Sequence, residues 1–129
     1  MNIRLDDARR WGLLLETLSE MSDLERQLVV QERRPRSFIP DILVEQWNIL
    51  FRGGRNLRSI GLSDVALAIL LDFHLQLEQL TSRMPDNTED KAGYIRNNEA
   101  WQAVREMADW TLSRLAVLLA PENVAFGPN

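Results

Sequence analysis

Few side chains in this sequence could perform acid–base or nucleophilic chemistry. The chain has one histidine, His74, and no cysteine, so disulfides, thiolate metal sites and thiol nucleophiles are excluded. Asp72 precedes His74 by two positions on an expected helix, and side chains at that spacing point about 200° apart and cannot pair. No nucleophile-elbow motif accompanies any serine. We therefore predict no catalytic residues and expect His74 to be a half-buried or surface side chain.

Four carboxylates form two pairs whose spacing places each pair on one helix face: Glu20 with Asp23, and Glu106 with Asp109. Two such pairs facing each other could bind Mg²⁺ and a pyrophosphate group, because hard cations prefer oxygen ligands. This arrangement resembles that of all-helical nucleotide pyrophosphohydrolases and implies, as an alternative function, a Mg²⁺-dependent nucleotide phosphohydrolase. Ordinary solvated helix faces show the same spacing, however, and Glu106 lies off the apolar stripe of its helix. The leading prediction is therefore no metal and no cofactor.

Positive charge is concentrated in residues 33–58, where six arginines outweigh two carboxylates. The arginines are Arg33, Arg34, Arg36, Arg52, Arg55 and Arg58. Guanidinium groups bind carboxylates and phosphates through paired hydrogen bonds, and Gly53-Gly54 would let backbone amides approach an anion. The segment is therefore a candidate surface for an acidic protein partner and, as a second alternative, for phosphate or nucleic acid. The spacing of the glycines does not match a P-loop, and the segment has no lysine, so that motif is excluded. The net charge of −4 argues against a general nucleic-acid binder.

The sequence contains four tryptophans, which is many for 129 residues. Trp47 and Trp101 fall on apolar helix faces and are predicted to anchor the core. Trp11 lies near the N-terminus, and Trp110 lies partly off the apolar stripe of its helix. Because tryptophans at the edge of such a stripe are common at subunit interfaces, Trp11 and Trp110, together with Phe126, are candidate interface residues.

Apolar residues recur at helical spacing in four segments. No stretch long enough for a strand alternates apolar with polar residues. The segments are residues 5–33, 40–52, 63–84 and 98–120. Ser63 and either Asn97 or Asn98 are suitable N-caps, and Pro85 ends the third helix. Ser22-Asp23 could cap a separate helix, so residues 5–33 form either one helix or two. Residues 85–95 form a linker in which one helical turn after Thr88 is expected, and Asn56–Ile60 could form a further short turn.

These segments predict an all-α fold, a single small bundle of four to five mainly antiparallel helices over residues 1–120, followed by a C-terminal tail at 121–129. The longest apolar run, residues 65–71, is far shorter than the roughly 20 residues of a membrane span. The charged N-terminus lacks the pattern of a signal peptide. We therefore expect a cytoplasmic protein that does not enter a membrane.

The unequal lengths of the expected helices bear on self-association. An unbroken helix over residues 5–33 would be about 45 Å long and would extend past its shorter neighbours. An apolar stripe left uncovered in this way favours pairing with a second subunit, so we expect a homodimer. With no catalytic motif, the leading functional expectation is a non-enzymatic interaction protein that acts as an adaptor, assembly factor or regulator.

Overall fold

The computed structural model describes residues 3–52 and 62–119, and in this part of the chain all regular structure is helical. The helices are α1 (Ile3–Ser22), α2 (Leu24–Arg33), α3 (Ile39–Phe51), α4 (Asp64–Leu80), α5 (Lys91–Asn97) and α6 (Glu99–Leu119). The predicted all-α helical bundle is confirmed, with six helices in the described residues in place of four to five. The turn expected at 56–60 and the tail at 121–129 lie outside the described residues.

The break between α1 and α2 is produced by Asp23 and Gln27. The Asp23 carboxylate accepts a hydrogen bond of 3.0 Å from the backbone N–H of Arg26 and caps α2. The buried Gln27 side chain donates through Nε2 to the carbonyl oxygens of Glu20 and Met21, at 2.7 and 2.8 Å. These carbonyls lie in the last turn of α1, where the helix's own N–H donors run out, and that of Glu20 also accepts from the backbone N–H of Asp23 at 3.2 Å. Gln27 therefore supplies side-chain donors at the end of that helix. Residues 5–33 therefore form two helices.

The remaining helix starts follow the predicted caps. Ser63 Oγ accepts from the backbone N–H of Ala66 at 3.1 Å at the start of α4, and Asn98 Oδ1 accepts from Trp101 at 2.9 Å at the start of α6. Pro40 occupies the first turn of α3, where its missing N–H is not needed.

Two boundaries differ from the prediction. Helix α4 ends at Leu80 instead of 84, and the hydroxyl of Thr81 donates to the carbonyl of Leu77 at 2.7 Å in the closing turn. The expected linker contains the two-turn helix α5, whose cap is the carboxylate of Asp90, bonded to the N–H of Gly93 at 2.9 Å. This helix begins later than the single turn predicted after Thr88.

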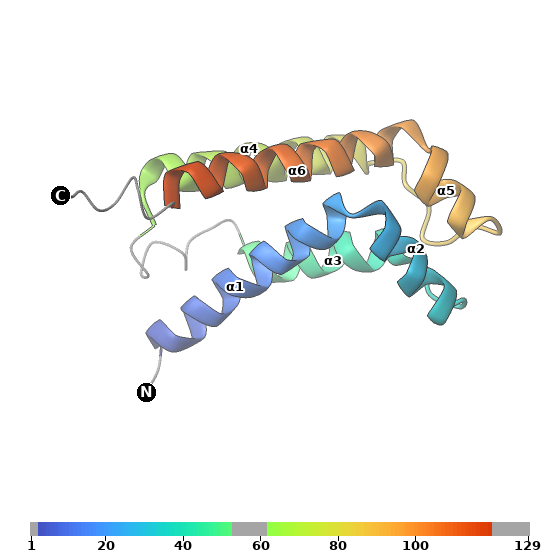
Figure 1. Cartoon of the computed structure of the whole chain (residues 1–129), viewed down its shortest axis with the longest axis horizontal. Helices are drawn as coiled ribbons and strands as arrows, with labels where there is room; N and C mark the ends of the chain where they lie inside the picture. Colours follow the sequence, from blue (N-terminus) through green and yellow to red (C-terminus); the bar gives the residue numbers. More distant parts are fainter. Residues whose placement is uncertain (1–2, 53–61, 120–129) are drawn as a thin grey trace.

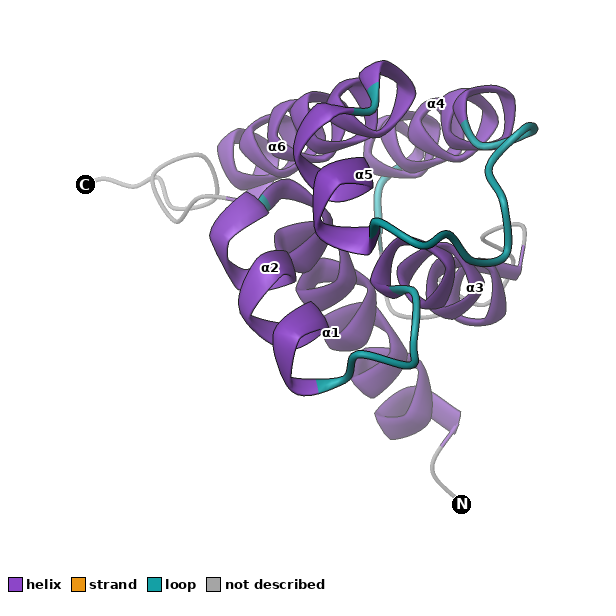
Figure 2. Ribbon diagram, turned by 90° about the vertical axis from the view of Figure 1, so that its right-hand side faces the viewer, coloured by secondary structure: helices purple, strands orange, loops and turns teal. Residues whose placement is uncertain are grey.

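The helices pack in two layers. Helices α4 and α6 lie side by side and run in opposite directions, while α1 and α3 lie against their inner side (Figures 1 and 2). Helices α2 and α5 contact each other at one end of the bundle. None of the described helices has the length and apolarity that crossing a membrane would require.

The core lies between the two layers, and Trp47 and Trp101 anchor it as predicted, with 0% and 1% of their surface exposed. The α1 side chains Leu14, Leu18 and Met21 are fully buried in the same core. Because α1 ends at Ser22, no 45 Å helix extends past its neighbours. Within residues 9–22 of α1, the apolar stripe formed by Leu14, Leu18 and Met21 is covered by the core.

Asp41, in the first turn of α3, supplies a test of the fold by pH. Burial raises the pKa of its carboxyl, and the nearby Asp86 and Glu45 raise it further. The folded protein thus binds this proton more tightly than the unfolded chain, so ionisation of Asp41 at neutral pH costs stability, and that cost disappears as the pH falls through the raised pKa to below 3.8.

We expect Asp41→Asn to raise the melting temperature at pH 7 and to lose this advantage on acidification. Melting curves of both proteins between pH 7 and pH 3 measure the difference directly. An advantage that grew as the pH fell would contradict the assigned direction.

Candidate interaction surface

Large apolar side chains that remain exposed gather on α4 and α6. Of the nine such residues in the described ranges, six belong to these two helices. We call them the α4–α6 face: Val65, Leu71, Leu75, Trp110, Val117 and Leu118. The largest of them, Trp110, is 64% exposed. By helical spacing, Leu71 and Leu75 lie opposite the buried side of α4, so they belong to the outer surface of the layer.

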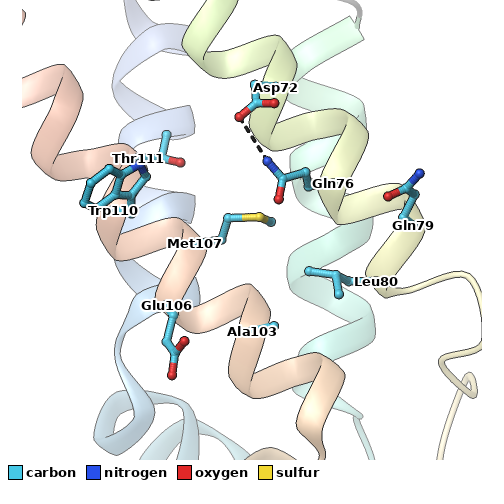
Figure 3. A pocket seen from close by; sticks show the side chains of 9 residues that line it. All are labelled: Asp72, Gln76, Gln79, Leu80, Ala103, Glu106, Met107, Trp110 and Thr111. Carbon is cyan, nitrogen blue, oxygen red and sulfur yellow. Dashed lines mark hydrogen bonds between the residues drawn. The ribbon is translucent and has the colours of Figure 1, made fainter.

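A groove of about 540 Å³ runs between α4 and α6 beside Trp110. Figure 3 shows it with the ribbons of α1 and α3 behind those of α4 and α6, so it opens on the outer side of the layer. Gln76 and Asp72 of α4 border it and are joined by a hydrogen bond of 3.0 Å, while Met107 and Trp110 line it from α6. The surface therefore combines an apolar rim with polar groups, as protein interfaces do.

One stripe of α6 is centred on Trp110. At 100° per residue, the positions seven before, four before, four after and seven after Trp110 all lie within about 40° of its direction. These are Ala103, Glu106, Arg114 and Val117. Glu106 and Arg114 are both exposed. Their spacing of four residues on either side of Trp110 is the signal in the sequence by which these two charges could have been found.

The predicted arginine surface is divided between the two ends of α3. Arg33, Arg34 and Arg36 are exposed around the α2–α3 connection. Arg52 follows α3 in a left-handed conformation with φ of 45°, and its Nε donates to the carbonyl of Ile49 at 3.0 Å. The length of α3, about 18 Å, separates the two groups. Arg55 and Arg58 lie outside the described residues.

The four predicted carboxylates do not come together. Glu20 lies 3.5 Å from Nε of Arg26, and Asp23 is used as the cap of α2. Glu106 borders the α4–α6 groove, and Asp109 is exposed on α6. Across residues 3–52 and 62–119, no three acidic or histidine side chains are grouped closely enough to hold a metal ion. Asp23 lies between α1 and α2, so it does not share a helix face with Glu20, whereas Glu106 and Asp109 both lie on α6.

His74 is half-buried and contacts aromatic side chains of the core. Its Nδ1 accepts a hydrogen bond of 3.1 Å from the indole N–H of Trp47, so Nδ1 carries no proton in this arrangement. Its Nε2 lies 3.6 Å from the carboxylate of Glu78. The ring also packs against Phe51, with 4.9 Å between the centroids. These contacts give the histidine a structural role.

The three candidate interface residues, Trp11, Trp110 and Phe126, differ in where the structure places them. Trp11 is half-buried and packs against the core, which leaves less of it available to a partner than Trp110 offers. Phe126 lies outside the described residues. Trp110 is therefore the candidate that the structure places on an open surface.

Comparison of the chain with protein-family models, with curated proteins and with solved structures finds no significant match.

Proposed function

We propose that this chain is a non-enzymatic interaction protein that works as a homodimer, and that two copies associate through the α4–α6 face. The observation that carries the proposal is the 64% exposure of Trp110 at the edge of a groove and among other exposed apolar side chains. Tryptophan is among the residues that contribute most to binding when an interface covers it. Contiguous apolar patches on soluble domains mark such interfaces.

The charges on the same face favour a second copy as the occupant. Glu106 and Arg114 lie on either side of Trp110 on one stripe of α6. A surface with one acid and one base beside a central aromatic is complementary to itself when one copy is reversed. A partner of a single charge sign would match only one of the two groups.

A homodimer formed in this way leaves another surface for function. The α2–α3 connection lies on the far side of the bundle from α4 and α6 (Figure 2). It carries the exposed Arg33, Arg34 and Arg36, which can bind the carboxylates of an acidic protein. The dimer would present this group twice, which suits an adaptor, assembly factor or regulator. The phosphohydrolase alternative has less support, because its four carboxylates lie apart.

Trp110→Glu tests the proposal. We expect the unaltered protein to have the mass of two chains of 14.9 kDa in sedimentation equilibrium, and the variant to dissociate at least about 30-fold more readily. The new carboxylate would be buried without a partner at the centre of the interface, whereas in the single chain it faces water. Circular dichroism should show an unchanged helix content.

Ile49→Glu is the matched control, because Ile49 is 55% exposed but lies on α3. This variant should stay dimeric. A single-chain mass for the unaltered protein at about 100 μM, or a dimer of undiminished strength in Trp110→Glu, would reject the proposal.

A further inference from the structure

The charges on the central stripe of α6 specify how two copies are arranged. Glu106 stands four residues before Trp110 and Arg114 stands four residues after it. At 1.5 Å per residue, each lies about 6 Å from Trp110 along the helix axis, in opposite directions. Both project within about 40° of the direction of the Trp110 side chain. The stripe is therefore symmetric in position about Trp110 and opposite in charge at its two sides.

We infer that the two copies place their α6 helices antiparallel against each other, with the twofold axis passing beside Trp110; this rests on the homodimer proposed above. In that register, residue 106 of one copy faces residue 114 of the other, and the symmetry repeats the contact. Two identical carboxylate–guanidinium pairs then flank a central pair of Trp110 rings, which can stack. Neither charge needs a partner from elsewhere in the chain.

The outer positions of the stripe fit the same register. Ala103 and Val117 stand seven residues on either side of Trp110, so an antiparallel arrangement places the small side chain of one copy opposite the larger side chain of the other. Small residues facing larger ones allow helices to approach to the usual 8–10 Å. Leu71 and Leu75, exposed on the outer side of α4, add apolar area to the same layer.

A parallel arrangement is disfavoured by the same residues. It would place Glu106 against Glu106 of the other copy and Arg114 against Arg114 of the other copy, and like charges in contact oppose association. The pattern thus favours one orientation and penalises the other, which is how many self-associating helices select their register.

Charge reversal tests the register directly. In Glu106→Arg homodimers two arginines meet at each of the two symmetric sites, and in Arg114→Glu homodimers two glutamates meet there. We expect each variant alone to dissociate about 30-fold more readily than the unaltered protein, since two attractive pairs become two repulsive ones. An equimolar mixture of the two variants should form heterodimers of nearly the original strength, because every pair then joins opposite charges.

The double variant Glu106→Arg with Arg114→Glu should regain the homodimer, because the reversed pair is again complementary. Asp109→Arg is the matched control: it makes the same change of charge on the same helix, about 100° from the direction of Trp110 and about 60° from that of Glu106, and should weaken the dimer far less than Glu106→Arg does. Sedimentation equilibrium measures all of these associations, and native mass spectrometry with one isotope-labelled variant identifies the heterodimer.

The outcomes separate the register from the proposed function. If Trp110→Glu abolishes association but the mixed variants show no preference for each other, the register is wrong and the homodimer stands. If the unaltered protein has the mass of one chain, both are rejected. Preferential heterodimers together with a restored double variant would support the antiparallel register.

Discussion

Replacing Gln27 with leucine is expected to lower the free energy of unfolding by about 3 kcal/mol, because two buried hydrogen bonds and one partly buried hydrogen bond are lost at once. The Gln27 amide donates to the carbonyls of Glu20 and Met21, and its Oε1 accepts from the indole N–H of Trp101 at 2.8 Å. Leucine has a similar volume but no polar atoms. The Met21 carbonyl and the Trp101 indole would then lose this partner in a site that is only 1% exposed at Gln27, whereas the Glu20 carbonyl keeps the backbone N–H of Asp23.

Urea denaturation followed by circular dichroism measures this loss. The matched control is Gln102→Leu, which also removes an amide that donates to a carbonyl, that of Arg96 at 2.8 Å. That bond is exposed, so water can replace it and the change should stay within about 0.5 kcal/mol. Equal losses in the two variants would show that the burial of the Gln27 amide has no special importance.

The second large effect concerns His74, which contacts Trp47 and Phe51 of α3. We expect His74→Leu to destabilise the fold by about 2 kcal/mol, because the indole N–H of Trp47 would lose its acceptor while its side chain stays fully buried. A double-mutant cycle with Trp47→Phe isolates the hydrogen bond, since the second substitution removes the donor. The two substitutions together should cost about 1 kcal/mol less than the sum of the separate losses.

Glu78→Gln distinguishes this role from that of the neighbouring contact with Glu78. The Glu78 side chain is 61% exposed and lies 3.6 Å from Nε2 of His74, so removal of its charge should change stability by less than about 0.5 kcal/mol. A large loss in this variant, with a small one in His74→Leu, would show that the contact with Glu78 matters more than the hydrogen bond to Trp47.

The helix starts that could be predicted depend on contacts within one turn. Ser63 and Asn98 each accept a hydrogen bond from the residue three positions later, and that relation is visible in the sequence. The break at Asp23 was left open between one helix and two, because Asp23 alone does not decide it. The contact that completes the break joins Gln27 to Trp101, which is 74 residues away and invisible to local pattern.

Helix α5 was predicted only as a single turn after Thr88, for a related reason. Its sequence is short and polar, and it is held by packing on α2 and by the Arg105 side chain of α6, which donates to the carbonyl of Ile95. An isolated helix of this length would be marginal, because nucleating a helix is costly and packing supplies most helix stability. Local propensity therefore gave no reason to expect more than one turn in this segment.

The candidate surface could be predicted only in part. Trp110 was recognisable because it lies off the apolar stripe of α6. The groove beside it was not, because it depends on how α4 packs against α6. The carboxylate pairs show the same limit: their spacing predicts Glu20 and Asp23 on one helix face, but α1 ends at Ser22 and Asp23 caps α2.

The hydrogen bond between Gln27 and Trp101 can form during synthesis only after Trp101 has been translated. The two residues are separated by 74 positions, which a ribosome adding roughly 5–20 residues per second translates in about 4–15 s. Until then the apolar side of α1, including Leu18 and Met21, has no α6 to cover it. The nascent chain thus spends seconds in which α1 can pack on α3 but not yet on α6.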